Sequence, residues 1–121
     1  MATYIEINGT KYPAVITGRL NDKDWGNRES KSIELEMTYM EAMETFVDNI
    51  AWSIVQDIEV MREVEDQRGN TITEQVIEQE VYDNSEYSIA GDIIDHRNGT
   101  VTVKMGKPTA EELLAILEEV L

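Results

Sequence analysis

Apolar and polar side chains alternate through the first part of the chain, which is typical of strands with one buried face. Asn8-Gly9 interrupts the alternation and predicts a hairpin, because both residues tolerate the positive φ angles of a type I′ turn. The predicted register contains three pairs: Ile7 with Thr10, Glu6 with Lys11, and Ile5 with Tyr12. Pro13 cannot donate a ladder hydrogen bond, so we expect the second strand to lie at a sheet edge or to be bulged there.

A polar loop at residues 21–29 separates this hairpin from a strand and a helix. The alternation of the strand places three residues on one apolar face: Ile33, Leu35 and Met37. Thr38 and Glu41 form a capping box, which predicts that a helix begins there and covers about residues 38–50. The expected apolar stripe of this helix consists of Met40, Met43, Val47 and Ile50.

The middle of the chain predicts a buried strand that leads into a ribbon. Ala51–Ile58 is apolar enough for a central strand, and we expect Trp52 to belong to the core. Residues 59–82 are rich in Val, Ile and Thr but carry charge on both faces, with a turn at Arg68-Gly69-Asn70. This pattern predicts a projecting β-ribbon over about residues 59–82. The alternative is a mobile loop, because two-stranded ribbons alone are marginally stable.

The last third of the chain predicts a second hairpin and a second helix. Strands over residues 87–97 and 100–105 flank Asn98-Gly99. A two-residue loop would pair His96 with Val101 and Ile94 with Val103. Thr109 and Glu112 form another capping box, so we expect a helix over about residues 109–120 that closes on the core. Its expected apolar stripe consists of Leu113, Ile116, Leu117 and Val120.

Together these elements predict one α+β domain over residues 1–121. We expect a mainly antiparallel sheet of about seven strands, because the pattern contains few strand–helix–strand units. Two helices, at about 38–50 and 109–120, and the ribbon at about 59–82 complete the predicted fold.

The charge distribution narrows the choice of partners. The formal net charge is −15, and residues 31–90 contribute −12 of it, since they hold 15 acids and three bases. Such a field disfavours nucleic acids and anionic membranes as direct partners and favours solubility, cations or a basic protein partner. From the ribbon and the Pro13 edge we expect a protein partner or self-assembly. The sequence lacks cysteine, an apolar spanning segment and a signal-peptide pattern, so we expect synthesis in the cytoplasm.

Catalytic and metal-binding patterns are weak. His96 is the single histidine, and Asp92 and Asp95 are the least generic acidic pair because they flank two isoleucines. The loop containing Asp22 and Asp24 has oxygen ligands at alternating positions, as a calcium loop does. A lysine interrupts that loop, however, and the expected terminal glutamate is missing. We therefore predict no cofactor, and we keep a small cation-binding module or carboxylate enzyme as an alternative.

Several residues are candidates for contact with other proteins. Trp25 lies in a polar loop, where it is either an exposed interface anchor or a cap that folds back on the core. The Pro13 strand would offer a sheet edge to a neighbour. Carboxylates of the ribbon would form the binding surface of an acidic inhibitor or nucleic-acid mimic: Glu63, Glu65, Glu74, Glu78 and Glu80.

Three stretches carry a resemblance to a known group of proteins: residues 24–31 (DWGNRESK), 82–85 (YDNS) and 96–109 (HRNGTVTVKMGKPT). With these stretches the chain resembles short uncharacterised proteins encoded in prophage and gut-bacterial genomes, sometimes among tail or structural genes. The resemblance implies a tail- or virion-assembly role, and hence a virion location after assembly. It transfers no functional residue.

We therefore expect a non-enzymatic structural or interaction protein, with a phage-type assembly subunit as its specific form. The absence of a catalytic constellation, the Pro13 edge and the long ribbon favour this hypothesis. The alternatives are an acidic inhibitor of a basic protein and the small cation-binding module or carboxylate enzyme.

Overall fold

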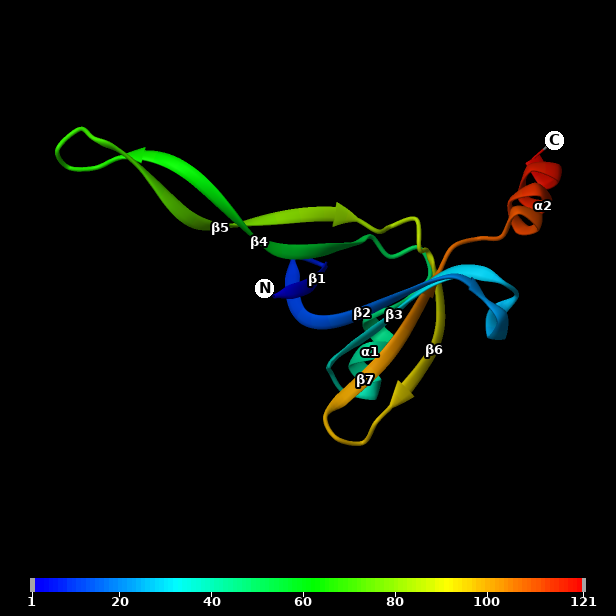
Figure 1. The fold of residues 1–121 in the computed structure, drawn as a ribbon. Coiled ribbons are helices and arrows are strands. Elements are labelled where there is room, and N and C mark those ends of the chain that lie inside the picture. Colours follow the sequence, from blue (N-terminus) through cyan, green and yellow to red (C-terminus); the bar gives the residue numbers. More distant parts are fainter. Residues whose placement is uncertain (1, 121) are drawn as a thin grey trace.

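The computed structural model describes residues 2–120 and confirms the predicted α+β class. Seven strands form one sheet in the order β5-β4-β1-β2-β3-β7-β6, and every neighbouring pair is antiparallel (Figure 1). The strands are β1 (Thr3–Ile7), β2 (Thr10–Asp22), β3 (Arg28–Glu36), β4 (Trp52–Glu65), β5 (Thr71–Asp83), β6 (Ile89–Asp95) and β7 (Thr100–Gly106). A 3-10 turn, η1 (Lys23–Trp25), follows β2, and the helices are α1 (Tyr39–Thr45) and α2 (Ala110–Val120).

Strand β2 changes its partner half-way. Its first residues, Thr10–Pro13, pair with β1, whereas Ala14–Asp22 pair with β3. The predicted edge position of Pro13 is therefore wrong for the strand order, since β2 lies between β1 and β3. Pro13 nevertheless has a ladder partner on one side only, Tyr4, so its missing N–H leaves no ladder bond unmade.

The two predicted hairpin registers have different outcomes. The register around Asn8-Gly9 is confirmed at all three pairs, and both turn residues have positive φ angles. The register of the last hairpin is wrong, because Asp95 rather than His96 pairs with Val101. Polar side chains support a longer turn: Asp95 accepts a hydrogen bond from the Arg97 N–H and Asn98 accepts one from Thr100. Ile93, and not Ile94, therefore stands opposite Val103, and a bulge between Ala90 and Ile93 shifts the register once more, so that Ala90 faces Met105.

The core lies between one face of the sheet and α1. Its sheet residues are buried side chains of β1, β3 and β7, among them Ile5, Ile7, Ile33, Leu35, Val101, Val103 and Met105. Trp52 is buried as predicted, and its indole N–H donates to the backbone oxygen of Tyr87 at 3.1 Å. The two rings meet edge to face, with centroids 6.3 Å apart.

Helix α1 begins as predicted but is shorter and presents a different face. The capping box is present, with Thr38 Oγ1 accepting from the Glu41 N–H at 3.1 Å. The buried side chains are Ala42 and Phe46, not the predicted stripe. Of that stripe Met40, Met43 and Val47 are exposed and Ile50 is half-buried. The helix stops early because the segment after it bonds to the start of β6: Asn49 donates to Ser88 and Asp48 accepts from the Ala90 N–H.

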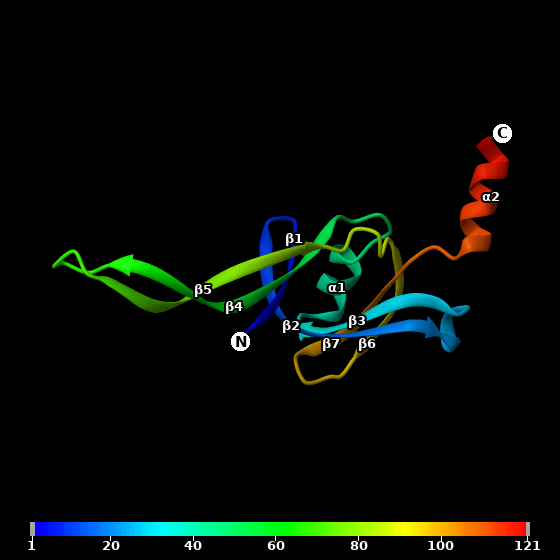
Figure 2. The same ribbon diagram turned by 45° about the horizontal axis from the view of Figure 1, so that its top comes forward.

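The projecting ribbon is confirmed. Strands β4 and β5 pair from Ser53 opposite Asp83 to Glu65 opposite Thr71, but β1 covers β4 only over Trp52–Gln56. Beyond that point, within the described chain, the two strands pair only with each other. Figures 1 and 2 show the resulting arm extending away from the rest of the molecule.

Helix α2 forms where predicted but does not close on the core. Its capping box is present, since Thr109 Oγ1 accepts from the Glu112 N–H at 3.2 Å. Leu113, Ile116 and Leu117 are 51–58% exposed, and α2 makes no extensive packing contact with another described element (Figure 2). The side chain of Val120, predicted for the same stripe, lies outside the described residues. None of the described helices has the length and apolar character needed to cross a membrane.

Candidate functional site

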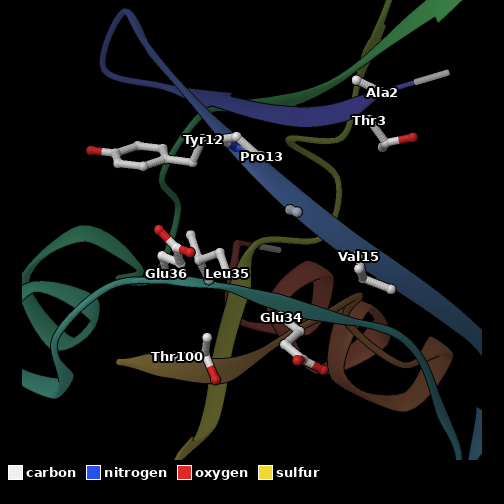
Figure 3. Close-up of a pocket in the computed structure, with 10 residues that line it drawn as sticks. Ala2, Thr3, Tyr12, Pro13, Val15, Glu34, Leu35, Glu36 and Thr100 are labelled. Carbon is white, nitrogen blue, oxygen red and sulfur yellow. The ribbon is translucent and has the colours of Figure 1, made fainter. Parts of the chain in front are cut away.

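A groove follows the point where β2 changes partners (Figure 3). It has a volume of about 620 Å³, and it is lined by Ala2, Thr3, Tyr12, Pro13, Ala14, Val15, Glu34, Leu35, Glu36 and Thr100. A neighbouring hollow of about 450 Å³ continues along Ala14, Val15 and Ile16 to Ile54 and Gln56 of β4. The groove exists because β1 and β4 diverge from β3 at Pro13, which leaves β2 paired on one side. Its lining contains apolar side chains and two carboxylates, those of Glu34 and Glu36, but no Lys, Arg or His side chain.

Trp25 caps the sheet and is not an exposed anchor. Its half-buried indole covers Gly91 of β6 and Gly106 of β7. A Cβ atom at either glycine would approach the ring to 2.7 Å, which is closer than van der Waals contact allows. The Arg28 guanidinium lies 4.9 Å from the ring centroid. It also donates to the Lys107 carbonyl, just before α2, and to Glu112 of α2. Of the two sequence-based alternatives for Trp25, the structure shows the folded-back one.

Asp22 is a buried carboxylate with a full set of partners. Lys104 Nζ lies 2.7 Å from its Oδ2, and the Ser30 hydroxyl donates to the same oxygen at 3.0 Å. The hydrogen bond from Lys104 lowers the pKa of Asp22 below its usual value. The other oxygen accepts from the Asp24 N–H of the 3-10 turn at 3.2 Å. Asp22 is therefore part of the fold's interior and not a free ligand of a calcium loop.

The other three candidates for catalysis, Asp92, Asp95 and His96, do not meet in one site. Asp92 lines a small hollow of about 60 Å³ beside Trp25 and Lys104. Asp95 holds the β6–β7 turn, and His96 lies 2.8 Å from the Thr102 hydroxyl on an exposed surface. Among residues 2–120, no group of three or more His, Cys, Asp or Glu side chains is placed to hold a metal ion. The cation-binding and carboxylate-enzyme hypotheses gain no support from this arrangement.

The five ribbon glutamates do not form a single surface. Because side chains alternate along a strand, the pairing of Arg62 with Glu74 places Glu74, Glu78 and Glu80 on one face. Glu63 and Glu65 lie on the other face. Arg62 also forms an ion pair with Glu78, which neutralises part of the first face. An inhibitor that mimics nucleic acid would need its carboxylates on one side, so the geometry does not favour that alternative.

An ionic cluster that the sequence did not indicate surrounds Tyr87. Its hydroxyl donates to Glu29, while Lys31 and Lys107 lie 4.5 and 5.0 Å from the ring centroid. Burial, and then the bond to Glu29, raise the pKa of Tyr87 above its usual value. Lys107 pairs with both Glu29 and Glu86 at 3.4 Å, so the charges of the cluster largely compensate one another. It therefore joins β3, the segment before β6 and the chain before α2, and we assign it no chemistry.

The comparisons with known proteins give no family. No protein-family model matches the chain. No curated protein and no solved structure matches it significantly. The comparisons therefore transfer no function to this chain. Its exposed surface includes two large apolar residues that the sequence pattern did not single out, Val15 and Leu20.

The cap of α2 predicts a measurable titration. Hydrogen bonds from the Thr109 backbone and then from Arg28, at 2.8 Å, lower the pKa of Glu112 from 4.5 to about 2. Since the folded-state pKa is depressed, the stabilisation is complete above pH 4.5 and is lost as the pH falls towards 2. A carbon-detected NMR titration should place the Glu112 midpoint near 2. Arg28→Gln should raise that midpoint only in part, because the backbone bond remains. An unchanged midpoint in Arg28→Gln would show that the ion pair with Arg28 does not lower the pKa of Glu112.

Proposed function

We propose that the chain is a non-enzymatic assembly subunit that contacts neighbouring subunits through the β4–β5 ribbon. The role in a phage-type tail or virion that the sequence resemblance implies is the specific form of this proposal. One observation carries it: strands of 14 and 13 residues continue well past the sheet that stabilises their base. Such an arm exposes backbone edges and apolar side chains to water, and contact with a neighbouring subunit would cover them.

The surface of the ribbon supports the proposal. Met61 and Ile77, on one face, are 65% and 66% exposed, and Ile72, on the other, is 40% exposed. Isolated two-stranded ribbons are marginally stable in water, so burial against a neighbour would stabilise this one. An unpaired strand edge can pair with a strand of another subunit, and the ribbon has such an edge on each side.

Helix α2 gives independent support. Its apolar stripe is turned towards solvent although a capping box and the Arg28–Glu112 pair fix the start of the helix. An amphipathic helix that is held in place without being buried is typical of a protein that completes its packing in a complex.

Shortening the ribbon tests the proposal. Met61 and Gln75 are directly opposite, so residues 62–74 can be replaced by Asn-Gly to close a tight hairpin. We expect the melting temperature to change by only about 2–4 °C, because surface changes away from the core cost little. We expect the mass measured by light scattering across a concentration series to fall below that of the full chain.

A full-length variant serves as the matched control. Residues 62–74 hold two bases and four acids, so their removal changes the net charge by +2. Glu63→Gln with Glu65→Gln makes the same change at full ribbon length, and this variant should assemble like the wild type. Equal masses for the wild type and the shortened chain would contradict a contact through the ribbon. A 13.8 kDa monomer at every concentration would contradict self-assembly and favour the acidic-inhibitor alternative.

A further inference from the structure

The sheet leaves four long strand edges unpaired within the described chain. They are the outer side of β5, the outer side of β6, the side of β4 that β1 leaves free from Ile58 to Glu65, and the side of β2 that β1 leaves free from Ala14 to Asp22. An unpaired edge is a template for another strand, and proteins usually protect such edges with charges, bulges or proline. The four edges differ in this protection, and the difference identifies the one that is suited to pairing.

Three of the edges carry protection. The β5 edge, Thr71–Asp83, has four acids and no base, so two copies of it would repel each other. The free part of the β4 edge, Ile58–Glu65, has three acids and one base. The β6 edge, Ile89–Asp95, has two acids and a bulge between Ala90 and Ile93. In a protein of net charge −15, these three edges resist pairing with a second copy of the same chain.

The free side of β2 lacks these devices. From Ala14 to Gly18 it carries no charge, and its two ionisable residues, Arg19 and Asp22, have opposite signs. Its bulge lies after Arg19, so the ladder with β3 is regular over six residues. Pro13 lies just outside this stretch and blocks none of its N–H groups.

The same stretch carries the most exposed large apolar side chains of the described surface. Leu20 is 78% exposed and Val15 is 68% exposed. Val15 also lines both hollows beside β2, where the sheet has opened. An unprotected edge beside exposed apolar residues is where strand addition would bury the most unfavourable surface.

We propose that Val15–Arg19 of β2 pairs antiparallel with the same segment of a second copy of the chain. The contact is two-fold symmetric and joins β6-β7-β3-β2 of each copy into one continuous sheet. This inference rests on the proposed function and deepens it, because it names one contact between subunits. The occupant is a second copy because this edge is the only one of the four without an excess of acidic side chains.

A two-fold axis at Thr17 gives a register without opposed like charges. Val15 of each copy then faces Arg19 of the other, and Ile16 faces Gly18. Glu34 lies beside Val15 on β3, so the incoming Arg19 would approach a carboxylate on the same face. The two Val15–Arg19 contacts per dimer make this position the most sensitive to charge.

Val15→Lys tests the pairing with little risk to the fold. Within one copy the new lysine stands opposite Glu34, a favourable cross-strand pair. Across the proposed contact it faces Arg19 twice, so we expect the dimer dissociation constant to rise at least about tenfold. Adding Arg19→Glu places opposite charges across the contact and should return the constant to within about threefold of the wild type. Sedimentation equilibrium of the ribbon-shortened chain measures these constants without the ribbon contact.

Met40→Lys in the ribbon-shortened chain is the matched control. Met40 is 65% exposed, and it lies one helical turn before a glutamate, Glu44, on α1. It should leave dimerisation through β2 unchanged, as judged against Val15→Lys in the same shortened chain. Equal dimerisation of Val15→Lys and wild type would overturn the inference, as would a monomeric wild type or a failure of Arg19→Glu to rescue. These outcomes concern only the β2 contact. The proposed function fails on a different result, an equal mass of the wild type and the ribbon-shortened chain.

Discussion

Trp52→Ala is expected to lower the free energy of unfolding by about 3–5 kcal/mol, the largest effect of any single substitution we predict. Trp52 is 2% exposed and lies where β4 is held between β1 and β5. Its removal leaves a cavity against Tyr87 and takes away the donor to the Tyr87 carbonyl. Both losses weaken the same contact, because the indole joins the sheet to the segment that precedes β6.

Chemical denaturation monitored by circular dichroism measures this effect. Trp52→Phe keeps much of the ring packing but not the N–H, so its loss should be smaller than that of Trp52→Ala. Met40→Ala is a surface control on α1, where the side chain is 65% exposed, and it should change stability by no more than about 0.5 kcal/mol. A Trp52→Ala loss as small as that of Met40→Ala would show that the core is not organised around this residue.

Gly106→Ala is expected to destabilise the fold by about 1–3 kcal/mol through overpacking. The new Cβ would lie 2.7 Å from Trp25 Cζ3 and 2.8 Å from Arg28 Cδ, so both side chains must move. Gly106 is buried, and its backbone is paired with β3 and β6, which prevents the strand from shifting instead. The cost arises from the cap formed by the indole and not from the backbone conformation of the glycine.

A double-mutant cycle checks this explanation. In a Trp25→Ala background only the contact with the flexible Arg28 side chain remains, so Gly106→Ala should cost clearly less there. Gly18→Ala is the matched control, because a Cβ at that strand position meets no atom within 4 Å. An equal cost of Gly106→Ala with and without the indole would rule out the cap as its cause.

The predictions that succeeded depend on neighbours in sequence. Asn8-Gly9 sets the first register through turn geometry, and the two capping boxes mark helix starts through bonds three residues apart. The ribbon was also predictable, since Val, Ile and Thr with charge on both faces fit a strand pair covered on neither side. These signals do not require knowledge of what lies across the core.

The predictions that failed depend on tertiary contacts. Two helical faces are apolar in the α1 segment, and only packing against β6 and β7 selects Ala42 and Phe46 over the methionines. The stripe of α2 predicted burial, but nothing local shows that the chain after Gly106 leads away from the core. Likewise, Asp22 meets Lys104 only because β3 lies between β2 and β7. The division of β2 between two partners has no local signature beyond Pro13.

The continuity of β4 has a mechanical consequence. The strand runs without a break from the free ribbon into the Trp52–Gln56 segment, which has ladder bonds to β1 on one side and to β5 on the other. Ladder bonds lie perpendicular to the strand, so a pull along the ribbon loads those of this segment together in shear and does not peel them one by one. The arm would thus transmit tension from its tip directly to the best-buried tryptophan of the fold.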